Sequence, residues 1–381
     1  MTTSRPATSG LAKVAAVLAL GTLTLAACGS DPVTTEPAGN ASAEGGNASG
    51  LACPSGTLTA EGSSAQNDAI TETIAAYNAA CGDKATIEYN PTGSGAGIKS
   101  FYNGLVDFAG SDSPLKSEES DGVVETEKAQ ERCQGNPAWN LPMVVGPIAF
   151  AYNLEGVDSL TLTPAVLAEI FSGKITSWND PKIAKLNSGV SLPGDKITVF
   201  FRSDESGTTE NTQKFLAAAA PKVWTDEPSK KWSGTGEGKN KSSGVAEGVT
   251  ATPGSISYME WSYAKTNELE TAKVDNGAGP VELTGETVAA AVSEAEVKGS
   301  GNDLSLGITY TDTPAGAYPA LLVTYEVVCS KGLPAEKTAL VKDFLGYFAG
   351  AEAQGALEEL GYAPLPEELA TKVSKAVESI A

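Results

Sequence analysis

Residues 197–209 read ITVFFRSDESGTT, which predicts a strand, a tight turn and the start of a helix in close succession. The β-branched and aromatic residues up to Phe201 favour a strand, and the pattern from Thr209 to Ala220 favours a helix. Units of this kind build α/β folds, in which helices flank a parallel sheet. The turn then lies at the carboxyl end of a strand, where such folds bind their ligands.

The turn contains several groups that bind anions. Ser206, Gly207 and Thr208 would lie on the first helical turn, where backbone N–H groups have no partner inside the helix. Arg202 precedes the turn and adds a fixed positive charge with a planar set of donors. Asp204 either pairs with Arg202 and orients its guanidinium or is a solvated turn residue. Together these residues predict a site for a small tetrahedral oxyanion.

Three similar units lie upstream and predict a parallel sheet. The expected elements alternate along the chain: strands over 56–59, 85–89 and 107–112, and helices over 65–80 and 96–103. Small polar residues follow each strand, namely Ser64, Ser94 and Asp112. Because the carboxyl ends of parallel strands meet at one edge of a sheet, we expect these three turns to gather there.

Two apolar, β-rich runs, 141–152 and 320–329, predict crossings between two lobes. Paired crossings form a hinge, and the cleft between two lobes can enclose a small ligand. The length of the chain after its N-terminal leader also favours two lobes over a single core. We therefore expect a discontinuous first lobe, 51–144 and 324–381, around a second lobe, 145–323.

Most other apolar patterns predict helices. These are expected over 163–171, with Thr163 as the N-cap and Pro164 in the first position, and over 286–297, 338–349 and 352–360. A further strand is expected over 254–259, and residues 221–243 are expected to be irregular.

Residues 1–27 are typical of a secretory signal peptide. Arg5 and Lys13 make a basic start, and the following apolar run is too short to span a membrane. The run ends Leu-Ala-Ala-Cys, which resembles the lipobox of bacterial lipoproteins and implies that Cys28 is the lipidated first residue of the mature chain. A plain signal peptide with an incidental cysteine is the alternative. Residues 28–50 are rich in small and polar residues and predict a flexible tether.

Four cysteines remain: Cys53, Cys81, Cys133 and Cys329. An even number in an exported chain favours disulfides, and three pairings are possible. We expect Cys53–Cys81, because a first strand and the helix antiparallel to it begin and end at the same edge. Cys133–Cys329 then follows by elimination. A zinc site is the alternative, but the sequence has no CxxC pattern and no histidine.

The formal net charge is −21, and loss of Arg5 and Lys13 with the leader would make it −23. Such a surface argues against nucleic acid as a partner and against electrostatic docking on anionic lipid. Anion binding must then be local, since donors in a closed cleft act at short range while surface charges are screened within about 10 Å. Arg132 and Arg202 are the only arginines after the leader, so Arg202 beside the turn stands out.

Asp112 would repel a bound anion unless the ligand carries a proton. An ionised carboxylate only accepts hydrogen bonds, so it can take one from a P–OH group. Phosphate keeps at least one proton at neutral pH and sulfate keeps none. An aspartate in the cleft would therefore select phosphate over sulfate. The alternative for Asp112 is an ordinary turn residue or helix cap.

Motifs of enzymes are weak in this chain. Ser206 lacks the GxSxG context of a nucleophile elbow, and no histidine is present to act as a base. Ser113 and Lys116 match SxxK, but no KTG follows. The loop 93–97 fits neither nucleotide-binding glycine pattern. It is either a flexible connection or a loop whose backbone approaches a ligand, with Ser94 as a donor. We expect no enzymatic activity, no cofactor and no bound metal.

Several separate stretches resemble the phosphate-binding lipoproteins of high-affinity phosphate ABC transporters. The matching motifs come in the family's order: GSGAGIK (93–99), DFAGSDSPL (107–115), IFSGKITSWNDP (170–181), RSDESGT (202–208) and GSISY (254–258). The resemblance runs from Leu58 to Tyr362. It implies the two-lobed periplasmic-binding-protein fold of type II, in which each lobe has a mixed, mostly parallel sheet flanked by helices and the ligand lies in the cleft.

The resemblance also implies phosphate-binding roles for the first lobe. Ser94 is the donor on the second turn, and Asp112 is the acceptor from the protonated ligand. On the first turn the family has a hydroxyl residue followed by a bulky, usually aromatic residue. Ser64 fits the hydroxyl, whereas Ala65 replaces the bulky residue and keeps only its N–H as a donor.

In the second lobe the resemblance makes Arg202 the cationic donor, held by Asp204. Ser206, Gly207 and Thr208 are the donors at the helix start. The whole chain is then a monomeric lipoprotein, anchored through lipid (palmitate) on Cys28 at the extracytoplasmic face of the cell membrane. It captures inorganic phosphate and delivers it to the permease subunits of an ABC importer. The alternatives are a binder of another oxyanion, sulfate or molybdate, and a phosphatase-like enzyme on the same fold.

Overall fold

The structure is a computed structural model that describes residues 50–381, except 121, 293–294 and 312. The expected signal peptide, the lipidated Cys28 and the tether up to residue 49 lie outside the described residues. Within the described ranges no helix is long and apolar enough to cross a membrane.

Helices and strands alternate through the first part of the chain. The strands are β1 (Gly56–Gly62), β2 (Ala85–Asn90), β3 (Phe108–Ser111), β4 (Ala138–Asn153), β5 (Thr161–Leu162), β6 (Thr198–Arg202), β7 (Glu237–Lys239), β8 (Ser255–Glu260), β9 (Glu270–Thr271), β10 (Lys273–Asp275), β11 (Pro280–Val281), β12 (Glu296–Val297), β13 (Leu306–Gly307) and β14 (Leu321–Cys329). The helices are α1 (Asn67–Cys81), α2 (Ser94–Tyr102), α3 (Glu125–Arg132), α4 (Pro164–Phe171), α5 (Pro181–Leu186), α6 (Gly207–Ala219), α7 (Lys241–Ala251), α8 (Trp261–Thr266), α9 (Gly285–Val292), α10 (Ala335–Phe348), α11 (Ala351–Ala356) and α12 (Glu367–Glu378).

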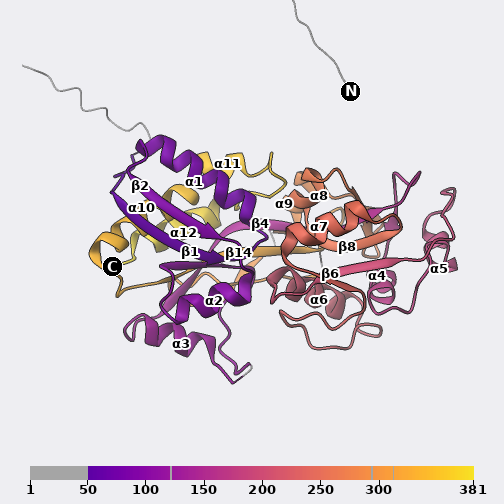
Figure 1. The fold of residues 1–381 in the computed structure, drawn as a ribbon, viewed down its shortest axis with the longest axis horizontal. Helices are drawn as coiled ribbons and strands as arrows, with labels where there is room; N and C mark the ends of the chain where they lie inside the picture. The colour runs from indigo at the N-terminus through magenta and orange to yellow at the C-terminus, as the bar shows by residue number, and fades with distance from the viewer. Residues whose placement is uncertain (1–49, 121, 293–294, 312) are drawn as a thin grey trace, which may run out of the picture. The chain divides into compact units, whose positions relative to one another are not determined.

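The main sheet has the strand order β2-β1-β3-β14-β4-β8-β6-β7, with β9 beside β4 (Figure 1). β1 is parallel to β2 and β3, and β6 is parallel to β7 and β8, as the strand–turn–helix units predict. β4 and β14 are antiparallel to each other and join these two groups into one path. We call β1, β2 and β3 with α1, α2 and α10 the β1 half, and β6, β7 and β8 with α6 and α7 the β6 half.

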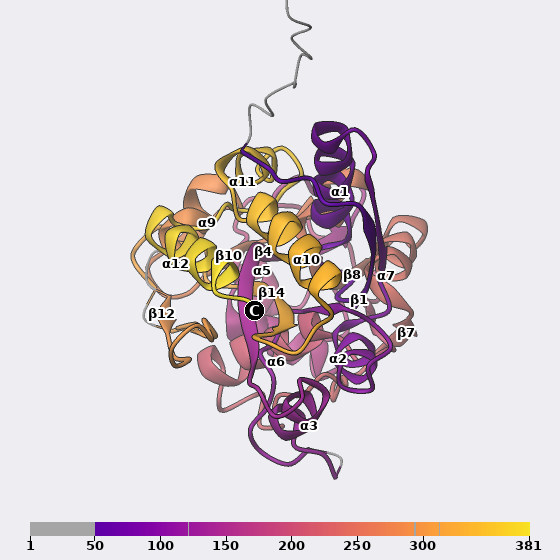
Figure 2. The same cartoon turned by 90° about the vertical axis from the view of Figure 1, so that its left-hand side faces the viewer.

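The two apolar runs form the two central strands. Every residue of β14 is buried, and so are residues 140–152 of β4. A continuous apolar run is what a strand covered on both faces requires. Helices provide that cover: in Figure 2, α1 and α10 lie on one side of β1, and α2 and α3 lie on the other.

Local signals explain where several helices begin. The Thr163 hydroxyl accepts the Val166 N–H at the start of α4, and Pro164 takes the first position, as predicted. At the start of α6 the Ser206 hydroxyl accepts the Thr209 N–H. The carboxyl end of β6 is therefore followed directly by a capped helix.

Some expected elements are wrong. The stretch 221–243 is not wholly irregular, since it contains β7 and the first residues of α7. α7 has the sequence KSSGVAEGVTA, whose two glycines weaken helix propensity, and packing against β6 and β8 decides its state. The helix expected over 286–297 ends at Val292, because residues 296–297 pair as β12 with β13. Helices α3, α5, α8 and α12 also lie outside the expected helices.

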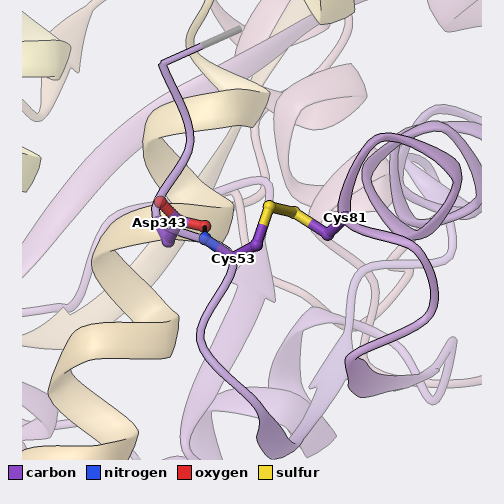
Figure 3. Close-up of side chains that lie close together, drawn as sticks. All are labelled: Cys53, Cys81 and Asp343. Carbon is purple, nitrogen blue, oxygen red and sulfur yellow. Dashed lines mark hydrogen bonds between the residues drawn. A yellow bond between two sulfur atoms is a disulfide. The ribbon is translucent and has the colours of Figure 1, made fainter. Parts of the chain in front are cut away.

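Both expected disulfides, Cys53–Cys81 and Cys133–Cys329, are present. Beside the first, Asp343 of α10 accepts the Cys53 N–H at 3.0 Å (Figure 3). Asp343 also accepts the Tyr77 hydroxyl at 2.8 Å. The segment before β1 is thus tied to both α1 and α10. Although the two sulfurs and the Asp343 carboxylate lie close enough to hold a metal ion, a disulfide has no thiolate to offer as a ligand.

We expect the Cys133–Cys329 disulfide to stabilise the protein more than the Cys53–Cys81 disulfide. The paired cysteines are 196 and 28 residues apart in sequence, respectively. On the chain-entropy model the longer loop gives roughly 1–2 kcal/mol more stabilisation. Urea unfolding of the Cys133→Ala/Cys329→Ala variant, with the Cys53→Ala/Cys81→Ala variant as its matched control, measures this difference. Equal losses would contradict the loop-length account.

Candidate functional site

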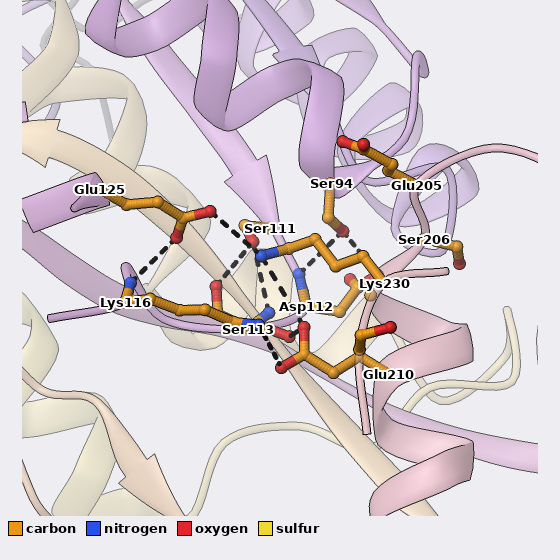
Figure 4. Close-up of polar contacts among 12 residues, drawn as sticks. Ser94, Ser111, Asp112, Ser113, Lys116, Glu125, Glu205, Ser206, Glu210 and Lys230 are labelled. Carbon is orange, nitrogen blue, oxygen red and sulfur yellow. Dashed lines mark hydrogen bonds and ion pairs between the residues drawn. The ribbon is translucent and has the colours of Figure 1, made fainter. Parts of the chain in front are cut away.

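Asp112, just after β3, is the point where the turns of the β1 half meet. It is 3% exposed. Its Oδ1 accepts the hydroxyls of Ser63 (2.5 Å) and Thr324 (2.7 Å), and its Oδ2 accepts that of Ser94 (3.0 Å; Figure 4). Since an ionised carboxylate has about four acceptor positions, one remains for a further donor. Burial raises the pKa of Asp112 to about 6, although the three hydroxyls favour its charged form.

Ser64 and Ala65 belong to the same turn but have other partners. The Ser64 Oγ lies 2.9 Å from the Ser242 Oγ, and the Ser64 carbonyl accepts the Tyr263 hydroxyl at 3.0 Å. The Ala65 N–H donates to the Ser63 Oγ at 3.0 Å. Ser63, rather than Ser64, therefore contacts Asp112, and Ser64 reaches across to the β6 half.

Arg202 ends β6 and is 3% exposed. Its Nε and Nη2 donate to the two carboxylate oxygens of Asp204 at 2.7 and 2.5 Å, so Asp204 is a partner of Arg202 and not a solvated turn residue. The remaining nitrogen, Nη1, donates to the Ser242 Oγ at 3.0 Å. Burial alone would raise the pKa of Asp204, but the hydrogen bonds and charge of Arg202 hold it below its usual range.

The first turn of α6 presents unpaired backbone donors. The Ser206 N–H donates to the Lys230 carbonyl at 2.9 Å, and the Ser206 hydroxyl is used as the helix cap. Among the described residues, the N–H groups of Gly207 and Thr208 have no acceptor. The Thr208 hydroxyl donates to the Glu260 Oε1. The helix start therefore has free N–H groups, while the Ser206 Oγ accepts a hydrogen bond and the Thr208 hydroxyl donates one within the protein.

Two glycines allow the halves to touch. A Cβ on Gly207 would lie 2.5 Å from the Cβ of Asp112 and 2.7 Å from the Ser94 Oγ. The Gly95 N–H donates to the Glu205 carbonyl at 3.0 Å, and a Cβ on Gly95 would lie 2.5 Å from the Cβ of Glu205. A side chain at either glycine would hold the two halves apart.

Beside this contact, ion pairs join the two halves around Glu210 of α6. Its Oε1 lies 3.4 Å from the Lys116 Nζ, and its Oε2 lies 3.7 Å from the Lys230 Nζ and accepts the Ser113 hydroxyl at 3.0 Å (Figure 4). The Lys230 Nζ also lies 3.4 Å from the Glu125 Oε1. Burial raises the pKa of Glu210, but its lysine neighbours hold it at about 2. Ser113 and Lys116 thus bind one carboxylate and do not form a nucleophile and its base.

Sequence reasoning missed four residues whose side chains hydrogen-bond to side chains of the expected ones in the described part of the chain: Ser63, Ser242, Glu260 and Thr324. Two of them had a usable signal, since Thr324 lies within an apolar strand and Glu260 ends one. A buried polar side chain in such a strand needs a partner. Ser242 lies at the start of α7, in a weaker copy of the same strand–turn–helix pattern.

Residues 47–352 match the family model described as the PBP superfamily domain. The chain is 43% identical over 371 residues to the phosphate-binding protein PstS 3 of Mycobacterium tuberculosis, covering 96% of this chain and 97% of that relative. It is 33% identical over 327 residues to the phosphate-binding protein PstS of Pasteurella multocida, covering 83% of this chain and 88% of that relative.

Solved structures share the fold. A high-affinity periplasmic phosphate-binding protein with bound phosphate aligns with a TM-score of 0.68 at 22% identity, covering 84% of this chain and 93% of that chain. A putative phosphate ABC transporter substrate-binding protein from Clostridium perfringens, also with phosphate, aligns with a TM-score of 0.58 at 19% identity, covering 82% and 100%. The fold is thus the predicted two-lobed α/β fold, and the chain belongs to the PBP superfamily and, within it, to the PstS family of phosphate-binding proteins.

Proposed function

We propose that this protein is an extracytoplasmic solute-binding protein that captures inorganic phosphate between two lobes and delivers it to an ABC permease. One observation carries the proposal: the buried acceptor Asp112 lies against Gly207, whose N–H, like that of Thr208, has no acceptor among the described residues. Free donors beside one unfilled acceptor position fit an oxyanion that keeps a proton. The names of the relatives and the phosphate in the neighbouring structures support this reading.

The proposed ligand contacts come from both lobes. We assign residues 51–144 and 324–381 to the first lobe and 145–323 to the second, with the hinge in β4 and β14. The contacts are Ser64, Ala65, Ser94 and Asp112 from the first lobe, and Arg202, Ser206, Gly207 and Thr208 from the second. Asp204 positions the guanidinium. The Ala65 N–H already donates to the Ser63 Oγ, so it must exchange that hydrogen bond to contact phosphate. The Ser206 Oγ accepts the Thr209 N–H and can still donate its own hydrogen to the ligand.

Closure of the two lobes would replace the water molecules around phosphate with hydrogen-bond donors held in fixed positions by the protein. Each hydrogen bond to a charged group contributes roughly 1.5–3 kcal/mol net. Several such bonds acting together support micromolar binding, about −8 kcal/mol. Asp112 supplies the selectivity, because sulfate would place an oxygen without a proton against the carboxylate.

The proposed activity is binding without covalent chemistry. The relatives are named as binding proteins, and the Ser206 hydroxyl, which a phosphatase-like enzyme would use as its nucleophile, caps α6. The sequence contains no histidine to act as its base. No specific observation favours sulfate, molybdate or catalysis.

Calorimetric titration at neutral pH should show phosphate binding at least roughly 100-fold tighter than sulfate. Asp112→Asn should narrow that gap, because the carboxamide can donate to a sulfate oxygen. Asp226→Asn removes an exposed carboxylate and serves as the matched control. Equal affinity of the unmodified protein for the two anions would refute the role given to Asp112.

Arg202→Lys should weaken phosphate binding by roughly tenfold or more, because lysine keeps the charge but loses the planar donor set that Asp204 orients. The retained charge still pairs with Asp204, so the variant should fold. Circular dichroism checks the fold. Calorimetry then compares the phosphate affinity of Arg202→Lys with that of the matched control Lys222→Ala, which removes an exposed positive charge. An unchanged affinity in Arg202→Lys would exclude the guanidinium as a ligand donor.

We further propose that Cys28 is the lipidated N-terminal residue of the mature protein, so that the protein is anchored at the outer face of the cell membrane. In cells, Cys28→Ser should move the protein from the membrane fraction to the soluble fraction and abolish labelling by palmitate. Retention of Cys28→Ser in the membrane fraction would contradict the lipid anchor.

A further inference from the structure

Glu326 is a buried carboxyl group that none of the preceding roles uses. It lies in β14, close behind Thr324, and has no exposed surface. Neither of its carboxyl oxygens has a hydrogen-bond partner among the described residues. Because buried polar groups are almost always hydrogen-bonded, a fully buried carboxyl without a partner needs an explanation.

Gly110 of β3 makes room for two polar side chains opposite Glu326. Gly110 and Glu326 are directly paired in the antiparallel ladder of β3 and β14, so a side chain on either would lie on the same face of the sheet. A Cβ on Gly110 would clash with the Gln66 Nε2 and with the Tyr89 hydroxyl. Gln66 and Tyr89 therefore occupy the place where a side chain at position 110 would lie beside Glu326.

These side chains form a chain of hydrogen bonds that lacks one donor. The Gln66 Nε2 donates to the Tyr89 hydroxyl at 3.1 Å, and the Tyr89 hydroxyl donates to the Ser63 carbonyl at 2.7 Å. The Gln66 Oε1 is also buried and has no donor among the described residues. An ionised Glu326 would add two more acceptors and no donor. A proton on Glu326 removes this shortage, because the acid can donate it to the Gln66 Oε1.

The same chain of hydrogen bonds leads to the proposed ligand site. Ser63, at its end, donates its own hydroxyl to Asp112 at 2.5 Å. Gln66 directly precedes α1 and closes the turn 63–66, which follows β1. Glu326 can therefore act on the site as a positioning residue, through this turn.

A neutral Glu326 also avoids a second negative charge beside Asp112. Burial, together with the charge of Asp112, raises the pKa of Glu326 to about 8, although the Gln66 amide opposes this. Tyr89 faces the same cluster, and burial raises its pKa well above the usual range, so it stays a neutral donor. In the part of the chain that the structure describes, no lysine or arginine pairs with Glu326. Ionisation would thus leave an unpaired buried charge close to the proposed anion site.

We propose that Glu326 is a neutral carboxylic acid that donates its proton to the Gln66 Oε1, and that in this form it positions the turn 63–66 for ligand binding. This inference rests on the proposed function. When the pH rises and the acid ionises, the Gln66 oxygen loses its donor and faces a carboxylate. The turn should then shift, and the affinity for phosphate should fall.

Calorimetry with inorganic phosphate at about pH 6 and about pH 9 tests this effect. The affinity of Glu326→Gln relative to the unmodified protein should rise by up to roughly tenfold between the two pH values, because the carboxamide can donate to Gln66 at either pH. The titration of phosphate itself is common to both proteins and cancels in this ratio. Glu88→Gln, an exposed change of the same kind on β2, should keep its ratio constant.

A constant ratio in Glu326→Gln would overturn the role of Glu326 and leave phosphate capture intact. Absence of phosphate binding by the unmodified protein at both pH values would instead refute the proposed function. Glu326→Leu has no donor, so it should bind phosphate several-fold more weakly than Glu326→Gln at about pH 6. Equal affinities of these two variants would contradict the hydrogen bond to Gln66.

Infrared spectroscopy of the unmodified, ligand-free protein tests the protonation state without any variant. The carbonyl stretch of a protonated carboxylic acid should be present at neutral pH and should disappear with a midpoint near pH 8. Glu326→Gln, where it folds, should lack this band. A spectrum of the unmodified protein without the band at neutral pH would refute the proposal.

Discussion

The buried ion pair between Arg202 and Asp204 is the interaction on which the geometry of the site depends. Burying an unpaired guanidinium costs several kcal/mol, and the two-oxygen contact with Asp204 offsets most of that penalty. The pair also fixes the direction of Nη1 toward Ser242, whose hydroxyl lies beside that of Ser64. Hydrogen bonds from Arg202 through Ser242 to Ser64 thus connect the end of β6 to the turn after β1. The Arg202 backbone N–H, bonded to the Tyr258 hydroxyl at 3.1 Å, holds the same residue from β8.

The proposed anion site is compatible with a strongly acidic chain because most of its proposed donors are uncharged dipoles. Backbone N–H groups at a helix start have no counter-ion to displace and undergo little reorganisation when a ligand arrives. The nearby lysines add little net charge, since Lys116 and Lys230 are largely compensated by Glu210 and Glu125. The field that an incoming anion meets is therefore set within a few ångströms and depends little on the net charge of −21.

Much of this arrangement was predictable because it follows from strand periodicity and turn chemistry. The parallel groups, the crossing strands and the meeting of Ser94 with Asp112 rest on such local rules. The disulfides followed from the number of cysteines and the expected packing of the first strand and helix, and the place of Gly207 opposite Asp112 followed from the family resemblance. The predictions that were wrong concern features that depend on tertiary contacts. The glycines of α7 weaken its propensity, and only packing makes it a helix. Adjacent serines 63 and 64 look alike in sequence, yet one contacts Asp112 and the other Ser242, and only the fold decides which one reaches Asp112.

The close approach at Gly207 and Gly95 has a consequence for which molecules the protein can hold. Backbone and Cβ atoms of the two halves meet directly there, so an anion held in the proposed site between them would have no room for a substituent. A sugar phosphate or a nucleotide carries such a substituent on one oxygen, and it would wedge the halves open. The ester bond would also occupy one of the phosphate oxygens that otherwise form hydrogen bonds with the protein. Where organic phosphates are abundant, the protein would take up only the free inorganic ion and leave esters to be hydrolysed elsewhere first.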